Sequence, residues 1–242
     1  MKIFLDPFDT KILKKDVYKL YLQDEESENI VLESIKEIKK GIIFCFTIFS
    51  PRNSNLLQQA GFNLISIRNT YKLNLNSLLE KNIEDCPNEY KILNKLKSIK
   101  GLQKKDLNQL ADTIYKTSRY SKDSSLGRNQ SRKIYTNWLN NSLYNNYASE
   151  AFLVFDQSTA IGIITIKIKD KIGSIDLLGI RQKYQNKGLA TYLLKKAVDY
   201  LITQDINDIF VTTEGENIPA NIFYQKNNFI LQNVELVYHK HI

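Results

Sequence analysis

The sequence predicts an α/β fold, an α+β arrangement around a mixed sheet, on three observations. Short apolar, β-branched runs such as Gly41–Phe49 and Ile172–Ile180 have the length and composition of strands. Between them lie segments such as Ala190–Ile202, whose apolar residues recur at helical spacing. Three strand-like runs within residues 151–180 are joined by very short links, which predicts an antiparallel meander.

Composition favours a globular protein with an anionic ligand. The chain has 242 residues, of which 43% are hydrophobic and 11% aromatic, enough to bury a core. Its net charge of +8 comes from 34 basic and 26 acidic residues spread along the chain. Because no dense basic block occurs, we do not expect a nucleic-acid partner, whereas a polyanionic small ligand such as a nucleotide suits this surface.

Cysteine and histidine usage argues against several kinds of site. Cys45 and Cys86 have no CxxC spacing, and His239 and His241 lie at the end of the chain. A disulfide framework, a histidine-ligated metal and a Ser-His-Asp site are therefore not expected. The first residues lack the apolar run of a signal peptide, and Gly41–Phe49 is too short to span a bilayer. We expect a cytoplasmic protein without a membrane partner.

The first 76 residues are predicted to form an N-terminal α/β domain of order β-α-β-α-β. Its expected elements are a strand over Ile12–Leu22, a helix over Glu26–Lys40, a strand over Gly41–Phe49, a helix over Asn53–Ala60 closed by Gly61, and a strand over Phe62–Leu75.

Residues 77–103 are polar and lysine-rich and are predicted to be a linker, with a strand near Tyr90–Leu96. The second domain is expected to cover residues 104–242. Its predicted elements are a helix capped by Asp106, a loop over Ser121–Asn129, a helix over Ser131–Leu143, strands over Ala151–Phe155, Ala160–Lys169 and Ile172–Ile180, a helix over Ala190–Ile202, a strand over Ile209–Thr213, a helix over Ile218–Gln225 capped by Asn217, and a closing hairpin of Phe229–Val234 and Glu235–His239.

The joint between Ile180 and Ala190 is the first candidate site. A strand that enters a helix through a glycine turn leaves the first N–H groups of the helix unpaired. Those donors and the positive end of the helix dipole form a site for a phosphate. Gly188 allows a diphosphate to approach the main chain.

Two motifs carry a resemblance to a known superfamily. Gln185-x-x-Gly188-x-Ala190 after a strand resembles the pyrophosphate loop of the GNAT acyl-CoA N-acyltransferases. Asn217-x-x-Ala220-x-x-x-Tyr224-x-Lys226-x-Asn228-Phe229 resembles the helix motif of the same family, one helix and one strand later. Asn228 replaces the usual glycine and is the next most tolerant residue of a left-handed backbone. The resemblance implies a GNAT fold in the C-terminal part, preceded by a smaller, partial GNAT-like domain, and acetyl-CoA as co-substrate without a metal.

A closer resemblance, spread along most of the chain, is to the bacterial dTDP-fucosamine (dTDP-4-amino-4,6-dideoxygalactose) N-acetyltransferases. The matching pieces, in order, are Phe8-Asp9, Gln59-Ala60-Gly61-Phe62, Ser118-Arg119-Tyr120, Tyr135-x-x-Trp138 and Tyr238. This resemblance implies a nucleotide-sugar substrate, a place in surface polysaccharide synthesis and a homodimer.

The resemblance also implies roles for individual residues. Tyr224 is the expected general acid for the leaving thiolate, because a phenol can donate that proton. Arg119 and Tyr120 are expected to bind the diphosphate and the base of the acceptor. The general base stays open among Asp176, Glu214 and Glu216, or a water chain alone, which can suffice for an amino sugar whose amine has a modest pKa. The expected donor-binding residues are Leu178, Gly179, Ile180, Gln185, Asn186, Lys187, Gly188, Leu189, Ala190 and Asn217.

Two other functions remain open at this point. The acceptor could be another amine, such as a polyamine or a protein N-terminus, although residues 118–132 are rich in arginine and lysine and would repel a cation. The chain could also be a non-catalytic module that binds coenzyme A or nucleic acid.

Overall fold

The computed structural model describes residues 1–23, 26–75 and 89–242, and one mixed sheet organises them. Its ten strands lie in the order β1-β2-β3-β10-β4-β9-β8-β7-β6-β5. The strands are β1 (Lys2–Leu5), β2 (Val17–Leu22), β3 (Ile42–Ile48), β4 (Asn63–Leu73), β5 (Tyr90–Asn94), β6 (Glu150–Asp156), β7 (Thr159–Lys169), β8 (Ile172–Ile180), β9 (Asp208–Glu214) and β10 (Phe229–His241).

Helices cover both faces of this sheet. Alternate strand residues enter different cores: Phe44 packs with the helices of one face, whereas Ile43 and Cys45 pack with those of the other. We call these the α7 face and the α8 face. The α7 face carries α1 (Pro7–Leu13), α5 (Lys104–Ile114), α6 (Arg119–Lys122) and α7 (Gly127–Tyr144), and the α8 face carries α2 (Glu28–Glu37), α3 (Pro51–Gln59), α8 (Leu189–Thr203) and α9 (Ile218–Lys226).

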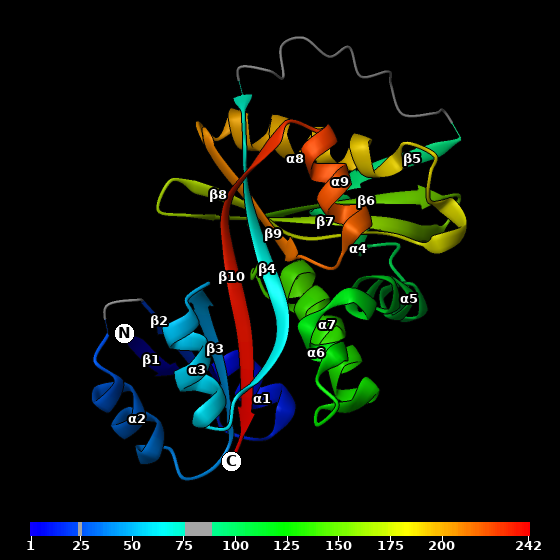
Figure 1. The fold of residues 1–242 in the computed structure, drawn as a ribbon. Helices are drawn as coiled ribbons and strands as arrows, with labels where there is room; N and C mark the ends of the chain where they lie inside the picture. Colours follow the sequence, from blue (N-terminus) through cyan, green and yellow to red (C-terminus); the bar gives the residue numbers. More distant parts are fainter. Residues whose placement is uncertain (24–25, 76–88) are drawn as a thin grey trace.

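The fold repeats one β-α-β-α-β unit, once as β2-α2-β3-α3-β4 and once as β8-α8-β9-α9-β10. In each unit the first two strands are parallel neighbours. The last strands are exchanged, so that β10 lies between β3 and β4, and β4 lies between β10 and β9. Figure 1 shows this pair, in cyan and red, running antiparallel through the middle of the molecule. Each half therefore completes the sheet of the other.

The matching helices α3 and α9 end alike at both termini. Ser50 caps α3 and Asn217 caps α9, each accepting a hydrogen bond from the backbone N–H three residues later. Beyond their C-termini, Gly61 and Asn228 both have positive φ, 81° and 64°. The sequence does not show this repeat by residue identity.

Near the two ends of the chain, the structure differs from the elements predicted from the sequence. The expected strand over Ile12–Leu22 starts later, because α1 occupies its beginning: Asp6 caps that helix and Pro7 takes its first turn. The expected closing hairpin is instead the single strand β10, because β4 fills the place of a partner strand.

The expected linker, residues 77–103, is structured over its described part. It contains β5, which pairs with β6 at the edge of the sheet, and the short helix α4 (Lys95–Ile99). Cys86 lies outside the described residues, whereas Cys45 is buried. Within residues 1–23, 26–75 and 89–242, no helix is both long and apolar enough to cross a membrane.

Candidate active site

The segment between β8 and α8 forms a cradle of free backbone donors. Asn186 and Gly188 both have left-handed backbones, with φ of 61° and 76°. None of the N–H groups of residues 186–190 has an acceptor among the residues that the structure describes. Five successive donors at the start of a 15-residue helix form an anion site, strengthened by the helix dipole. We call residues 186–190 the N–H cradle.

The side chains around the cradle hold its shape. The Gln185 amide donates to the carbonyl of Ile180 over 2.9 Å and so closes the turn. Leu189 is buried and anchors the start of α8 in the core. Lys187 is exposed and donates to the Tyr90 hydroxyl over 3.0 Å, so its charge lies at the rim. In this loop, backbone N–H groups rather than side chains are free to bind an anion.

Strands β8 and β9 separate next to the cradle. They pair only from Ile172 to Ile175 of β8, opposite Asp208 to Val211 of β9, while the other edge of β9 pairs with β4 as far as Glu214. The separation starts at Asp176, which has no partner on β7 and is the extra residue of a β-bulge. The edge of β8 that faces β9 is therefore unpaired over Leu178, Gly179 and Ile180. We call this gap the strand cleft.

Gly179 is glycine for a steric reason. A Cβ at this position would lie 2.6 Å from the Ile114 side chain of α5. Its backbone can therefore lie close under α5 only without a side chain. The predicted trio of Leu178, Gly179 and Ile180 thus forms one open strand edge.

Tyr224 lies on the α8 face of the cleft, in the same core as Ile180 and Leu189. It is 5% exposed, and burial raises the pKa of its phenol, which keeps the hydroxyl protonated. The hydroxyl makes no hydrogen bond to a described residue, while the ring packs against Tyr71, Phe223 and Phe229. A protonated, unengaged phenol beside the cleft has a proton to donate.

Asn217 has a structural use in addition to any contact with a ligand. Its side-chain oxygen accepts from the Ala220 N–H at 3.4 Å, and its amide donates to Thr213 at 3.3 Å. It thereby ties the start of α9 to the end of β9, at the mouth of the cleft.

Comparison with known proteins gives the family of the segment that contains the cradle and the cleft. Residues 114–229 match the model of the acetyltransferase (GNAT) family. They form a GNAT acetyltransferase domain. The match agrees with the family that the sequence motifs predicted, whose enzymes use acetyl-CoA as co-substrate.

Individual relatives resemble the chain at low identity. The spore coat polysaccharide biosynthesis protein SpsD of Bacillus subtilis is 24% identical over 131 residues, 54% of this chain and 45% of SpsD. Streptothricin acetyltransferase A of the same organism is 30% identical over 86 residues, 35% of this chain and 50% of that enzyme. The chain thus spans half or less of the length of these relatives.

A solved GCN5-related N-acetyltransferase from Sphaerobacter thermophilus shares the fold. Its TM-score is 0.58 at 10% identity, over 88% of this chain and 65% of that one. The likeness confirms the predicted α/β class with a GNAT domain in the C-terminal part.

Asp176 lies at the start of the GNAT strand cleft and is mostly withdrawn from water. Burial raises the pKa of its carboxyl, although Ser174 donates to it over 2.7 Å. The Tyr147 phenol faces the same carboxylate, and burial together with this charge raises the pKa of Tyr147 to about 12. Of the three carboxylates left open by the sequence, Asp176 combines a place at the cleft with a raised pKa, as a general base requires.

Glu214 and Glu216 are engaged in the junction between the two halves. Ser66 of β4 donates to Glu214 over 2.6 Å and bridges to Glu216 at 3.0 Å. The Arg119 N–H donates to Glu214, and Lys122 forms an ion pair with Glu216. These contacts tie β4, β9 and α6 together.

Arg119 and Tyr120 lie inside the junction rather than on an open loop. The Arg119 guanidinium stacks 4.3 Å from the Tyr120 ring and 5.4 Å from Phe46, and donates to the Tyr120 hydroxyl. Tyr120 is 2% exposed and donates to Asp9 over 2.9 Å. The predicted stacking of Tyr120 on a base has no free ring face here. Arg119 has one buried N–H, at Nε, without an acceptor among the described residues.

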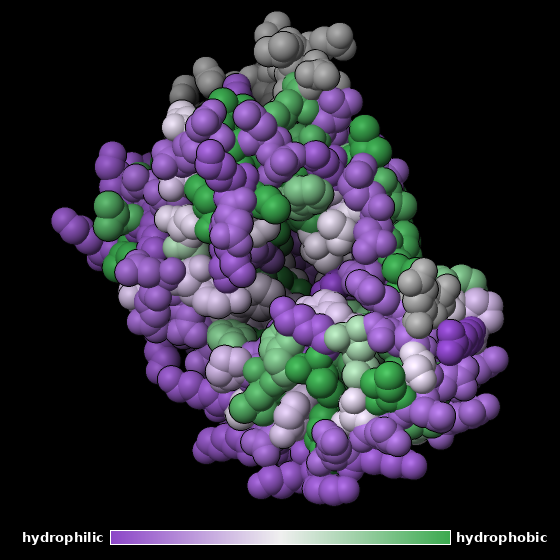
Figure 2. Space-filling view, turned by 90° about the vertical axis from the view of Figure 1, so that its left-hand side faces the viewer, coloured by the Kyte–Doolittle hydropathy of each residue, from purple (hydrophilic) through white to green (hydrophobic). Residues whose placement is uncertain are grey.

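An aromatic group contributed by both halves lies near Asp176. Phe8 of α1 stacks 5.8 Å from Tyr147 and lies 6.3 Å from Trp138 of α7. All three rings are half-buried. Figure 2 shows a hollow near the middle of one face of the molecule. Sequence reasoning noted Phe8 and Trp138 through the resemblance but missed Tyr147, which follows a helix end in a polar segment without a motif.

The N-terminal half has no equivalent cleft. Its strands β2 and β3 pair over the whole of β2, from Val17 to Leu22, with no bulge. Glu26 precedes α2 and pairs with the amino terminus of the chain.

Proposed function

We propose that the chain is an acetyl-CoA-dependent N-acetyltransferase that acetylates the amine of a nucleotide-linked amino-deoxysugar, for surface polysaccharide synthesis. The observation that carries the activity is the strand cleft with an acid on one face and a carboxylate on the other. The sugar substrate is supported by the motif resemblance and by the relative whose name refers to polysaccharide biosynthesis.

Each group has a defined task in this proposal. The N–H cradle binds the diphosphate of the donor, and the open edge of β8 offers backbone donors to the pantetheine arm and the thioester carbonyl. Acetyl-CoA supplies the acetyl group as a thioester. The amine attacks directly from the α7 face, and no residue is acylated, because no described cysteine or histidine lies at the cleft.

Two side chains move the protons. Asp176 accepts the proton that the amine loses, directly or through one water. Tyr224 donates a proton to the thiolate on the α8 face. The acid and the base thus lie on opposite faces of the sheet, so neither neutralises the other.

A second acceptor class, a cationic amine such as a polyamine, is favoured by one observation. Two cations of the segment 118–132 that would repel it are neutralised, Lys122 by Glu216 and Arg132 by Asp112. The carboxylates Asp9 and Asp176 lie near Tyr147 on the acceptor side. Homodimer formation remains a prediction from the resemblance alone.

The test is acetyl-CoA turnover against matched panels of dTDP- and UDP-amino sugars, polyamines and peptides. We expect the highest kcat/KM for a nucleotide-linked amino sugar. Turnover confined to polyamines or peptides would replace the sugar assignment, and release of CoA without any acceptor dependence would reject the transferase itself.

A further inference from the structure

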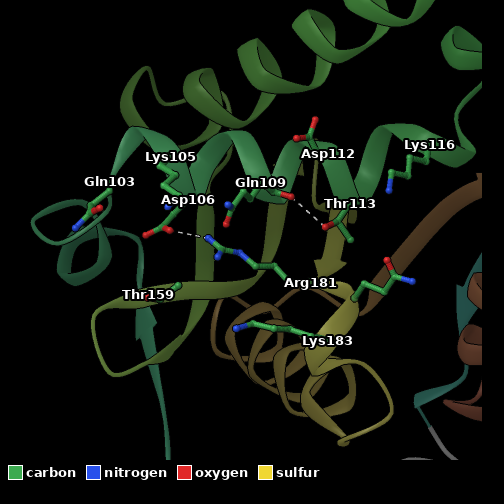
Figure 3. Close-up of a pocket in the computed structure, with 11 residues that line it drawn as sticks. Gln103, Lys105, Asp106, Gln109, Asp112, Thr113, Lys116, Thr159, Arg181 and Lys183 are labelled. Carbon is green, nitrogen blue, oxygen red and sulfur yellow. Dashed lines mark hydrogen bonds and ion pairs between the residues drawn. The ribbon is translucent and has the colours of Figure 1, made fainter.

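A cavity of about 690 Å³ lies beside the strand cleft, between α5 and the chain that leaves β8. Figure 3 shows α5 along one wall, with Lys105 and Lys116 near its ends, and Arg181 and Lys183 on the opposite wall. We call this cavity the lysine pocket. It is separate from the N–H cradle, none of whose residues line it.

The pocket adjoins the reacting end of the cleft. Thr113 lines it, and the Thr113 side chain lies 3.9 Å from the position of a Cβ on Gly179. Gly179 is the middle residue of the open edge of β8. A ligand that reaches from the cleft into the pocket therefore passes one residue of α5.

The charges in the pocket are unbalanced toward positive. Its two carboxylates are already paired, Asp106 with Arg181 at 2.7 Å and Asp112 with Arg132 at 2.8 Å. Lys105, Lys116 and Lys183 have no carboxylate partner among the described residues. Lys183 also lies 4.8 Å from the Tyr184 ring, which leaves its charge uncompensated. Three ammonium groups without a carboxylate around one cavity create a positive potential that a phosphate would satisfy.

Arg181 is a pre-positioned donor in this pocket. It is 11% exposed and is held by Asp106, which is itself 7% exposed. Its Nε–H is buried without an acceptor in the part of the chain that the structure describes. Because an unmade hydrogen bond at a buried donor is costly, this atom needs an acceptor that the described residues do not provide.

We propose that the lysine pocket binds a phosphate group of a substrate, as a second anion site beside the N–H cradle. The inference rests on the proposed function, because both its donor and its nucleotide-linked acceptor carry phosphates. Lys105, Lys116 and Lys183 supply the charge, and Arg181 supplies fixed N–H donors.

Calorimetric titration of CoA and, separately, of dTDP into the purified protein tests this and identifies the source of the phosphate. In the variant Lys105→Ala/Lys183→Ala we expect one of the two nucleotides to bind about tenfold more weakly, the loss of one charge-assisted contact. Weaker CoA assigns the pocket to the donor, and weaker dTDP assigns it to the acceptor.

Matched controls make the result specific. Lys169→Ala/Lys171→Ala removes the same charge from the exposed β7–β8 turn and should leave both affinities within twofold. Lys116→Ala alone, at the other end of the pocket, should weaken the same nucleotide. Unchanged affinity for both nucleotides, equal losses in the control, or no binding of either to the unaltered protein would overturn the proposal. Titration needs no turnover, so a chain that acetylates none of the amines still gives a result for the pocket.

Discussion

Tyr224 shows how a common residue acquires a distinct chemical state from its surroundings. The chain has 14 tyrosines, and most hydroxyls near the core are used in hydrogen bonds, such as that of Tyr71 to Asn221. Tyr224 is buried at the cleft with an unengaged hydroxyl and a raised pKa. Its protonation therefore persists across the pH range in which an amine acceptor is deprotonated.

Replacing Tyr224 with Phe should lower kcat by about 100-fold, the lower range of general acid–base catalysis, and leave the Kd of acetyl-CoA within about twofold. Steady-state kinetic assays measure kcat, and calorimetric titration measures the Kd of acetyl-CoA. Tyr200→Phe on the far part of α8 is the control and should change neither. If Tyr224→Phe turns over like the parent, the tyrosine has no part in the proton transfer.

Asp176→Asn should lower kcat by about 100-fold and at the same time raise the stability of the protein at pH 7. Burial raises the pKa of Asp176 in the folded protein, so folding favours the protonated carboxyl. The free energy of unfolding therefore falls as the pH rises through this pKa and the carboxyl becomes charged. Urea unfolding at pH 7 and pH 4 should show the gain at pH 7 only. A variant with full activity would make Glu214 or Glu216 the better base.

Gly188 links the residue scale to the element scale, because the whole N–H cradle depends on its positive φ. Gly188→Ala would force a Cβ to within 3.3 Å of Tyr192 and keep a left-handed alanine, a cost of about 1 kcal/mol. We expect the Kd of acetyl-CoA to rise about tenfold. Gly101→Ala, with nothing within 4 Å, is the control. Equal Kd values for both variants would disprove the role of the cradle.

At the element scale, β10 joins the two halves because it pairs with β3 and β4. It also carries His239, whose contact with Asp123 is sensitive to acid. His239 on β10 donates from Nδ1 to the Asp123 carboxylate over 2.7 Å, and His241 contacts the same carboxylate oxygen at 2.8 Å. Burial lowers the pKa of His239 to about 4, and the two histidines lower that of Asp123 to about 2. The folded state thus prefers a neutral imidazole beside a charged carboxylate.

This contact predicts how stability depends on pH. A depressed histidine pKa gives stability that is present above the unfolded value near 6.5 and is lost as pH falls toward 4. The loss is on the order of 3 kcal/mol at most, from the difference between these pKa values. Urea unfolding free energies at pH 7.5 and 4.5 measure it. In the variant His239→Gln, the unfolding free energy should change less between pH 7.5 and pH 4.5. If it falls as steeply as in the parent protein, another group causes the loss of stability in acid.

At the scale of the whole molecule, the exchange of β4 and β10 makes the two halves one folding unit. β4 supplies ladder hydrogen bonds to β9 and β10, and β3 pairs with the other edge of β10, so a fragment of residues 89–242 would leave β10 without a partner strand and expose one edge of β9. The domains predicted from the sequence, residues 1–76 and 104–242, therefore share this one sheet.

We therefore expect fragments 1–75 and 89–242 to be unfolded when expressed separately and to form a folded complex when expressed together. Circular dichroism melting of each fragment and of the mixture measures this. The intact chain should show one cooperative transition. A fragment 89–242 that melts cooperatively alone would show that β4 is dispensable for the GNAT fold.

Much of the site could be predicted from sequence because its chemistry is local. Gln185–Ala190 and Asn217–Phe229 are short motifs in which glycine, cap and tyrosine positions are fixed by a single turn or helix. The helices and strands from Ala151 to Lys226 were predicted to within a few residues for the same reason. The family match confirms the assignment that these motifs predicted.

Other features depend on contacts between distant residues and could not be predicted in this way. The hairpin expected over Phe229–His239 failed because its partner strand, β4, comes from the other end of the chain. Tyr120 is buried against Asp9, more than 100 residues away, and its contact with a substrate stays a prediction. The base was unassigned until the bulge placed Asp176 where β8 and β9 separate.

The sequence by itself therefore determined the glycine turn of the N–H cradle, the capped helix that carries Tyr224 and the family, because backbone conformation and helix capping act over a few residues. Only the tertiary structure decided which carboxylate faces the cleft, which strands exchange and where a second set of cations converges. Those features arise from long-range strand pairing and burial, which no short window of sequence records.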